Sequence, residues 1–342
     1  MAYTTVNKST SFFNDKFYTG TGSTNALTGL GFQPDWVWIK ARSTGYDNNL
    51  FDSLRGTEKR LKANANSAED TVSGSLTAFG TDGFTVGSDA GANNNGTTFA
   101  SWGWKAGTTS IPSGSTSDPS AVSINTTSGF GIYKITAPGS GNYVLKHGLS
   151  ATPAMVIVKR TDGTQKWMVW HKTFSNATDD YLQLNSNAAK ATYSTCWGTM
   201  NTTDCTIATG GTLDTSAEHI IYVFTEKTGY SKFGKFIGNG STDGPFIYTG
   251  FKPSFVIAKE SSSTGHWRMR DNKRMTSGNP IDKLLRPDQT NAEQTEDNVD
   301  FLSNGFKMRT TGGENNGSGD TYIYMAFGQT IVGTNNVPTT AR

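Results

Sequence analysis

Three side chains that can exchange protons occupy corresponding places in the sequence. Asp52, His171 and Asp271 each follow a proline by eighteen residues. Hydrolysis of a glycosidic bond needs two carboxyl groups about 5–10 Å apart, and the chain has 28 Asp and Glu residues that could supply them. However, a histidine in the middle copy suits a surface position at a strand end better than a general acid. The sequence also has no HExxH, CxxC, GxSxG or phosphate-loop motif, so we predict no catalytic residue and a protein that is not an enzyme.

Five side chains are candidates for contact with a ligand at the surface: Trp167, Trp170, Trp267, Arg268 and Arg270. The flat apolar face of a tryptophan can stack on a sugar ring while neighbouring polar groups bind its hydroxyls. Trp167 and Trp267 both follow a proline by fourteen residues, and basic residues flank each of them. This pattern predicts a strand with one polar, exposed face that is available to a ligand.

Two loops could supply oxygen ligands to a hard cation. Residues 89–96 and 314–320 are rich in Asp, Glu, Asn and Gly, and calcium is bound by six to eight oxygens. The loops lack the EF-hand spacing, and Asn-Gly sequences form hairpin turns without a metal. We therefore predict structural turns, no metal site and no cofactor, with calcium as the alternative. Cys196 and Cys205 could form a disulfide or remain free thiols.

An internal threefold repeat organises these residues. The segment GFQPDWVWIK at 31–40 returns as GFKPSFVIAK at 250–259, and a weaker copy, PAMVIVK, occupies 153–159. The prolines of these copies are 119 and 100 residues apart, and further landmarks follow each of them in the same order. Such a repeat predicts three similar units.

Four other tryptophans are predicted to lie in the core: Trp36, Trp38, Trp102 and Trp104. Their positions recur with Met, Ile, Tyr or Phe in the later copies, so any large apolar side chain suffices there. Short apolar runs, alternating runs and frequent Asp-Gly or Asn-Gly turns indicate strands rather than helices. We predict an all-β chain of three tandem antiparallel β-sandwich repeats of the jelly-roll or concanavalin-like kind.

The composition of the intervening segments suggests the domain boundaries. A Gly/Ser/Pro-rich stretch separates the first two repeats and reads as a flexible linker, while the second junction is tight. We therefore expect repeats two and three to dock as a pair while repeat one moves. The predicted division is repeat 1 at 1–107, linker at 108–128, repeat 2 at 129–228, repeat 3 at 229–330 and a C-terminal tail at 331–342.

Charge and hydropathy exclude several classes of partner. The formal net charge of the 342 residues is +2 and no basic run is present, so we expect no nucleic acid partner. The sequence has no stretch of 18 apolar residues, so we predict no membrane-spanning helix. The first twenty residues lack the pattern of a secretory signal.

The GFQPDWVWIK segment, together with DSLRG at 52–56 and SWGWKAG at 101–107, resembles a repeat family of tailed-phage virion proteins. Such proteins occur in phages of marine bacteria such as cyanobacteria and pelagibacteria. The second repeat is similar to modules of phage tail-fibre proteins. The third repeat departs from the pattern at 268–274 and 284–287. The family has no agreed catalytic residues to carry over.

The resemblance implies a non-enzymatic structural protein exposed on the virion and assembled in the host cytoplasm without a signal peptide. A tail-fibre or spike component for host attachment is favoured, and a head decoration or fibre protein is the alternative. The implied partners are other virion proteins and a host surface glycan, without membrane insertion. A homo-oligomer is expected, with a trimer favoured.

Overall fold

The computed structural model describes residues 4–328, apart from the side chain of Asp297. The predicted tail at 331–342 lies outside this range. Strands hold 45% of the described residues and helices 3%, which confirms the all-β prediction. No helix among the described residues is long and apolar enough to cross a membrane. We refer to residues 13–104, 121–225 and 231–328 as segments A, B and C.

Segment A forms a six-stranded and a three-stranded antiparallel sheet, with orders β1-β9-β3-β4-β5-β6 and β2-β8-β7. A short 3-10 helix, Ser9–Ser11, precedes them. The elements are β1 (Phe13–Thr19), β2 (Asn25–Thr28), β3 (Trp36–Ala41), β4 (Asn49–Asp52), β5 (Lys59–Lys62), β6 (Asp70–Thr71), β7 (Leu76–Gly80), β8 (Gly83–Val86), α1 (Ala90–Asn93) and β9 (Thr98–Trp104).

Segment B forms a seven-stranded and a three-stranded sheet, with orders β10-β11-β19-β13-β14-β15-β16 and β12-β18-β17. Its strands are β10 (Ala121–Asn125), β11 (Phe130–Thr136), β12 (Asn142–Lys146), β13 (Pro153–Arg160), β14 (Met168–His171), β15 (Asp180–Gln183), β16 (Ala191–Thr192), β17 (Trp197–Met200), β18 (Asp204–Ala208) and β19 (Glu218–Thr225).

Segment C forms two four-stranded sheets, with orders β20-β27-β22-β23 and β21-β26-β25-β24. Its elements are β20 (Ser231–Ile237), β21 (Phe246–Tyr248), β22 (Pro253–Glu260), β23 (Arg268–Asp271), β24 (Ile281–Leu284), β25 (Gln294–Leu302), β26 (Gly305–Met308), α2 (Gly313–Asn316) and β27 (Thr321–Gly328).

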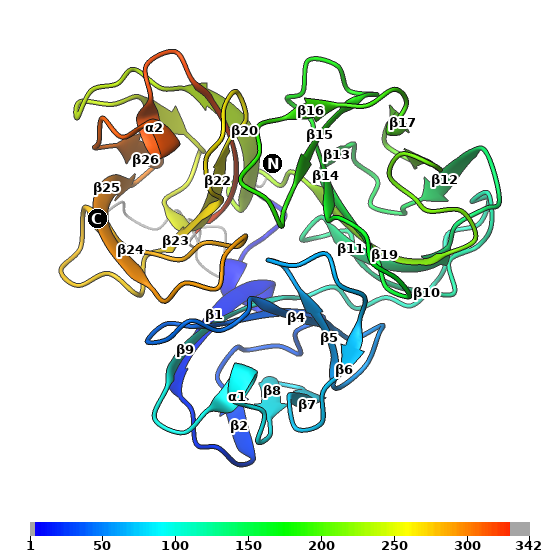
Figure 1. Ribbon diagram of the computed structural model, residues 1–342, viewed down its shortest axis with the longest axis horizontal. Coiled ribbons are helices and arrows are strands. Elements are labelled where there is room, and N and C mark those ends of the chain that lie inside the picture. The colour runs from blue at the N-terminus through cyan, green and yellow to red at the C-terminus, as the bar shows by residue number, and fades with distance from the viewer. Residues whose placement is uncertain (1–3, 329–342) are drawn as a thin grey trace.

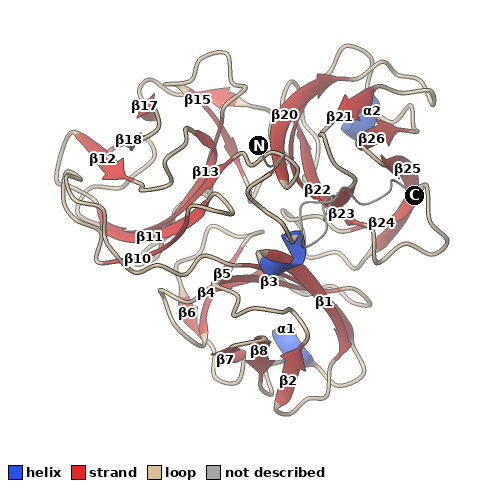
Figure 2. Cartoon of the chain, turned by 180° about the vertical axis from the view of Figure 1, so that it is seen from behind, coloured by secondary structure: helices blue, strands red, loops and turns tan. Residues whose placement is uncertain are grey.

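One strand order recurs in the three segments. The series β1-β9-β3-β4, β11-β19-β13-β14 and β20-β27-β22-β23 place corresponding strands side by side, and every pairing is antiparallel. The three segments form three groups of strands around a common centre (Figure 1). Strands β3, β13 and β22 lie toward that centre, and the sheets β2-β8-β7, β12-β18-β17 and β21-β26-β25-β24 lie toward the periphery (Figure 2).

A single hydrophobic cluster fills the centre and draws on all three segments. Aromatic rings meet across every boundary: Trp36 stacks on Tyr222 with centroids 4.7 Å apart, and Phe13 lies 5.3 Å from Phe255. Phe224 and Phe327 lie 6.2 Å apart. The four tryptophans predicted to lie in the core are at most 1% exposed, which confirms that prediction.

Backbone hydrogen bonds also join the segments at repeated positions. The carbonyl groups of Arg42, Thr161 and Ser261, each eight residues after its proline, accept from an N–H of another segment. Their donors are Glu293, Glu69 and Lys190, at 2.8–2.9 Å. These bonds run from C to A, from A to B and from B to C, and so form a closed cycle.

The structure corrects two predictions about the junctions. Residues 108–128 are not a linker throughout, because β10 pairs with β11 and Thr108 forms a bridge with Ile124. Segment A is also not separate from a docked pair of segments B and C, because backbone hydrogen bonds join it to both of them. Composition indicated turns and polarity in this stretch but could not show which strand edge it would pair with.

Candidate functional site

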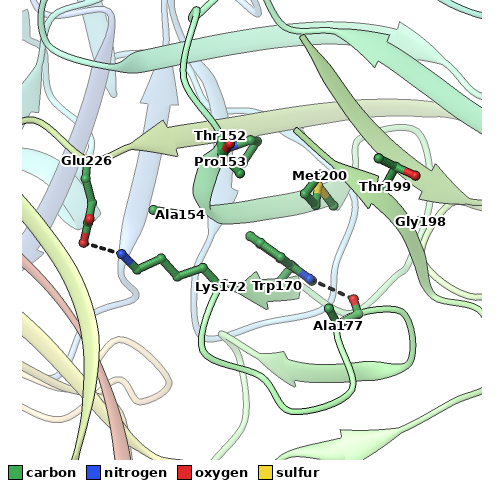
Figure 3. Close-up of a pocket in the computed structure, with 10 residues that line it drawn as sticks. All are labelled: Thr152, Pro153, Ala154, Trp170, Lys172, Ala177, Gly198, Thr199, Met200 and Glu226. Carbon is green, nitrogen blue, oxygen red and sulfur yellow. Dashed lines mark hydrogen bonds and ion pairs between the residues drawn. The ribbon is translucent and has the colours of Figure 1, made fainter. Parts of the chain in front are cut away.

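An open pocket of about 510 Å³ lies beside Trp170 in segment B (Figure 3). We refer to it as the Trp170 pocket. Its lining combines an indole, small apolar side chains, two threonines and an ion pair. The residues are Thr152, Pro153, Ala154, Trp170, Lys172, Ala177, Gly198, Thr199, Met200 and Glu226.

Strands of both sheets of segment B position the lining. Trp170 belongs to β14, and its Nε1 donates to the carbonyl oxygen of Ala177 at 2.9 Å, which fixes the orientation of the ring. On the opposite side, the pairing of β17 with β18 is irregular between Trp197 and Met200. A Cβ atom on Gly198 would lie 2.6 Å from Cγ2 of Thr206, so a glycine permits this close approach. The irregularity lets Thr199 and Met200 both line the pocket.

An ion pair supplies the charged groups of the pocket. Lys172 Nζ lies 2.6 Å from Glu226 Oε1, and their side chains are 32% and 28% exposed. The backbone N–H of Phe233 donates to the same oxygen at 2.9 Å, and the Lys172 N–H donates to the carbonyl of Ala154. Both charged side chains are thus held while remaining accessible to a ligand.

This arrangement suits a polar ligand with an apolar face. Trp170, Met200 and Pro153 offer apolar surface, while Lys172 can donate and Glu226 can accept hydrogen bonds from hydroxyl groups. Saccharides have both features. Trp170 is 4% exposed, and the other seven tryptophans are at most 1% exposed.

The predicted exposure of the five candidate residues is wrong in this structure. Trp167, Trp170, Trp267, Arg268 and Arg270 are all buried, with at most 5% exposed. Only Trp170 lines the pocket. The indole N–H groups of Trp167 and Trp267 donate to the carbonyls of Lys62 and Gln183 in neighbouring segments, at 2.9 and 2.8 Å. Flanking basic residues suggested solvent, but another segment covers these tryptophans.

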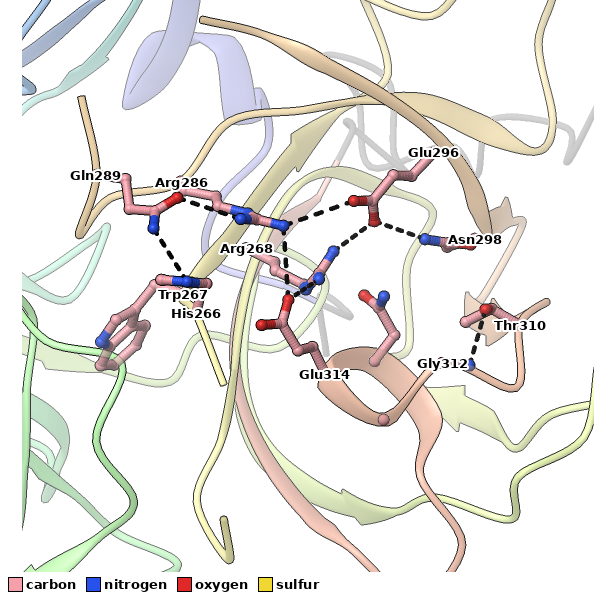
Figure 4. A network of polar contacts seen from close by, with 12 residues as sticks. His266, Trp267, Arg268, Arg286, Gln289, Glu296, Asn298, Thr310, Gly312 and Glu314 are labelled. Carbon is pink, nitrogen blue, oxygen red and sulfur yellow. Dashed lines mark hydrogen bonds and ion pairs between the residues drawn. The ribbon is translucent and has the colours of Figure 1, made fainter. Parts of the chain in front are cut away.

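The two arginines belong to a polar network inside segment C. Figure 4 shows Arg268 of this network together with Arg286, Glu296 and Glu314. Arg268 contacts Glu296 at 2.5 Å and also pairs with Glu314. Arg270 donates to Asn315 Oδ1 at 3.1 Å. Both guanidinium groups are therefore turned toward internal partners rather than toward solvent.

The three proton-exchanging positions lie at boundaries between segments. Asp52 accepts from the Tyr222 hydroxyl at 2.7 Å, and Asp271 accepts from Trp102 Nε1 at 3.3 Å. His171 Nε2 lies 3.3 Å from the carbonyl oxygen of Tyr324. Burial lowers the pKa of His171 to about 3, so its ring is neutral. The predicted surface position is wrong, because all three side chains are fully buried.

Side-chain amides organise the two loops considered for calcium. Asn93 Nδ2 donates to the carbonyls of Ser23 and Gly87, and Asn316 Nδ2 donates to those of Ser241 and Thr310. Each amide thus ties its loop to backbone groups outside the loop. Within residues 4–328, no group of three or more His, Cys, Asp or Glu side chains is arranged to hold a metal ion. Cys196 and Cys205 are free and buried.

Sequence reasoning missed most of the pocket. Thr199 and Met200 are neighbours on β17, but Lys172 and Glu226 come from other parts of the chain, and no motif links the four residues. The position of Lys172 is occupied by Ser53 and Asn272 in the other segments. The polar residue at this position, which differs among the three segments, was a signal in the sequence that pointed to the pocket.

A family model described as "Domain of unknown function (DUF7483)" matches residues 8–330. The chain belongs to this family. The DUF7483 match spans segments A, B and C, so the family comprises all three together. No curated protein and no solved structure matches the chain.

Proposed function

We propose that this DUF7483 protein is a non-enzymatic structural protein exposed on a phage particle, where it serves as a tail-fibre or spike component for host attachment. The observation that carries the attachment role is the Trp170 pocket, which has the size and the mixed lining that a saccharide needs. The resemblance of the GFQPDWVWIK and SWGWKAG segments to virion repeats supports the location.

We also propose that the chain consists of three tandem β-sandwich repeats of the jelly-roll or concanavalin-like kind, arranged about an approximate threefold axis. The recurring strand order supports this organisation. The cyclic hydrogen bonds to Arg42, Thr161 and Ser261 support it independently, because equivalent residues make equivalent bonds.

The proposed ligand is a saccharide of the host surface. Such a unit would lie against the apolar surface of Trp170 and Met200, and its hydroxyl groups would bond to Lys172 and Glu226. Repeated copies of the protein on one particle would strengthen attachment through multivalency even if each site bound weakly.

A decoration role on the phage head is the second candidate. The three segments contact one another at corresponding positions, so the chain is pseudo-threefold symmetric. A protein of this symmetry would match a point on the phage head where three copies of a partner protein meet. The homotrimer implied by the resemblance stays a prediction. Light scattering of the purified chain would test it, since one chain has a mass of 36.7 kDa.

Immunogold electron microscopy of particles from a phage that encodes this chain would test the proposed function. We expect gold on the tail or its fibres. Gold on the head would favour decoration over attachment, and particles that contain the chain at neither place would overturn the virion role. Incubation with host envelope polysaccharide should release no reducing sugar, and clear release would overturn the non-enzymatic proposal.

A further inference from the structure

One backbone hydrogen bond recurs at the same place in all three segments. Its acceptor is the carbonyl of the residue directly after the repeated proline, and its donor is the N–H of the residue nineteen positions after that proline. The donor–acceptor pairs are Ser53 with Asp35, Lys172 with Ala154, and Asn272 with Ser254, at 2.9–3.0 Å. Each pair therefore marks the same position in its segment, which we call the post-proline position.

Contacts within the chain fill the post-proline position of segment A. The Asp35 carboxylate accepts from the Ser53 hydroxyl at 2.9 Å and from the Ser123 hydroxyl of segment B at 3.2 Å. It also accepts from the N–H of Ala106, in the connection between the two segments, at 2.8 Å. Asp35 is buried, so this position offers its polar groups to the chain itself.

The same position adjoins an open pocket in each of the other two segments. In segment B, Ala154 and Lys172 line the Trp170 pocket. In segment C, Ser254 and Asn272 line a second pocket of about 240 Å³, which we call the Asn272 pocket. Its facing wall comes from residues 9–15, which comprise the 3-10 helix and the first residues of β1. The full lining is Ser9, Thr10, Phe13, Asn14, Asp15, Ser254, Asn272, Lys273 and Gly328.

A lysine–carboxylate pair lies in the Asn272 pocket, as one does in the Trp170 pocket. Lys273 Nζ pairs with Asp15 and also donates to Asn14 Oδ1 at 3.1 Å. The Asp15 side chain is 6% exposed and that of Lys273 is 47% exposed. The charge of Asp271 also acts on Asp15, but Asp271 is itself paired with Arg274. Because the lysine ammonium already contacts the acceptors and a carboxylate repels anions, the pocket suits a neutral ligand better than an ion.

Polar side chains dominate the walls of the Asn272 pocket. Seven of its nine lining residues carry a hydroxyl, amide, carboxylate or ammonium group, and Phe13 is the aromatic member of the lining. Hydroxyl and amide groups both donate and accept hydrogen bonds, as the hydroxyl groups of a sugar do. A volume of about 240 Å³ corresponds to about eight water molecules at roughly 30 Å³ each, which is enough for one sugar residue.

We propose that the Asn272 pocket is a second saccharide site of this chain, at the position that corresponds to the Trp170 pocket in segment B. This inference rests on the proposed attachment function. Hydroxyl groups of one sugar residue would bond to Asn272, Ser254 and Lys273, between segment C and the residues that lead into segment A. Two sites on one chain would hold separate parts of one polysaccharide, which strengthens attachment without a change in either site.

Equilibrium dialysis of the full chain counts the sites. The probe is a fluorescently labelled oligosaccharide prepared by partial hydrolysis of host envelope polysaccharide. The unaltered chain should bind two equivalents at saturation. Thr10→Tyr, which fills the Asn272 pocket, and Thr199→Tyr, which fills the Trp170 pocket, should each bind one equivalent, and the double variant should bind none. Thr242→Tyr, at an exposed loop position of segment C, is the matched control and should bind two.

A milder variant guards against a folding defect in Thr10→Tyr. Asn272→Ser introduces the residue that segment A has at this position, and it should weaken the second site about two- to tenfold through loss of the amide. Unchanged affinity in Asn272→Ser would overturn the second site. One equivalent that Thr10→Tyr retains and Thr199→Tyr loses would also overturn it, but would leave the proposed function intact. Binding by none of the proteins would overturn both.

Discussion

The Tyr222 hydroxyl donates a hydrogen bond of 2.7 Å to Asp52 Oδ2, across 170 residues of sequence and between segments B and A. The same carboxylate forms a fully buried ion pair of 2.5 Å with Arg55. Asp271 has the corresponding arrangement with Arg274 and Trp102. A repeated carboxylate-arginine pair therefore anchors one segment and also holds a neighbouring one.

Removal of the Tyr222 hydroxyl should weaken the boundary between segments A and B. Tyr222→Phe leaves a buried oxygen of Asp52 with one donor fewer, and we expect the free energy of unfolding to fall by about 1–3 kcal/mol. Urea unfolding followed by tryptophan fluorescence measures this. Tyr193→Phe is the control, because Tyr193 is 54% exposed, and an equal loss in the control would contradict the interpretation.

The buried pair of Asp271 with Arg274 should contribute far more than an exposed pair. Arg274→Met leaves the buried Asp271 carboxylate without its arginine and removes one of the two arginines that pair with Glu293, so we expect a loss of about 3–5 kcal/mol. Arg160→Met breaks ion pairs with partly exposed side chains and should cost about 1 kcal/mol or less. Similar losses in both variants, measured by denaturant unfolding, would be inconsistent with this difference.

Stability should decrease on acidification because His171 is buried in its neutral form. Burial lowers its pKa from 6.5 to about 3, so between these values the unfolded chain binds a proton that the folded chain does not. The contribution of His171 to the free energy of unfolding is therefore complete above pH 6.5. It decreases as the pH falls toward 3, by up to about 1.4 kcal/mol per pH unit. His171→Gln should reduce the slope of unfolding free energy against pH. An unchanged slope would show that other groups cause the acid dependence.

Limited proteolysis should cut residues 109–118, where most side chains are exposed, and spare 121–128, where β10 pairs with β11. Because the aromatic centre joins all three segments, we expect the two fragments to remain associated. Gel filtration of the cleaved protein without denaturant tests this. Fragments that elute separately would show that segment A is held by the chain connection alone.

A bulky residue at the mouth of the Trp170 pocket should block a saccharide. Thr199 lines the pocket and is exposed, so Thr199→Tyr should fold normally and weaken binding of host envelope glycan at least about tenfold. Thr242→Tyr, at an exposed loop position of segment C, should bind as the unaltered chain does. Binding measured on immobilised host polysaccharide distinguishes the two. Unaltered binding by Thr199→Tyr would exclude this pocket as the glycan site.

The local sequence determined the strands and the central tryptophans. Trp36 and Trp104 recur as other large apolar residues in the same register, and this repetition identifies a buried face, because any large apolar side chain satisfies it. Asp-Gly and Asn-Gly turns likewise predicted short antiparallel strands, since these turns reverse the chain by their own backbone preference. The all-β class followed from these features.

The tertiary structure alone decided what covers each strand. Trp267 has basic neighbours and looked exposed, yet its indole N–H bonds to Gln183 of another segment. Periodicity shows which face of a strand is apolar or polar, but the covering segment is distant in sequence and depends on how the sheets pack together. For the same reason, the Trp170 pocket could not be predicted: Lys172 and Glu226 are 54 residues apart in sequence, and packing brings their charges to 2.6 Å.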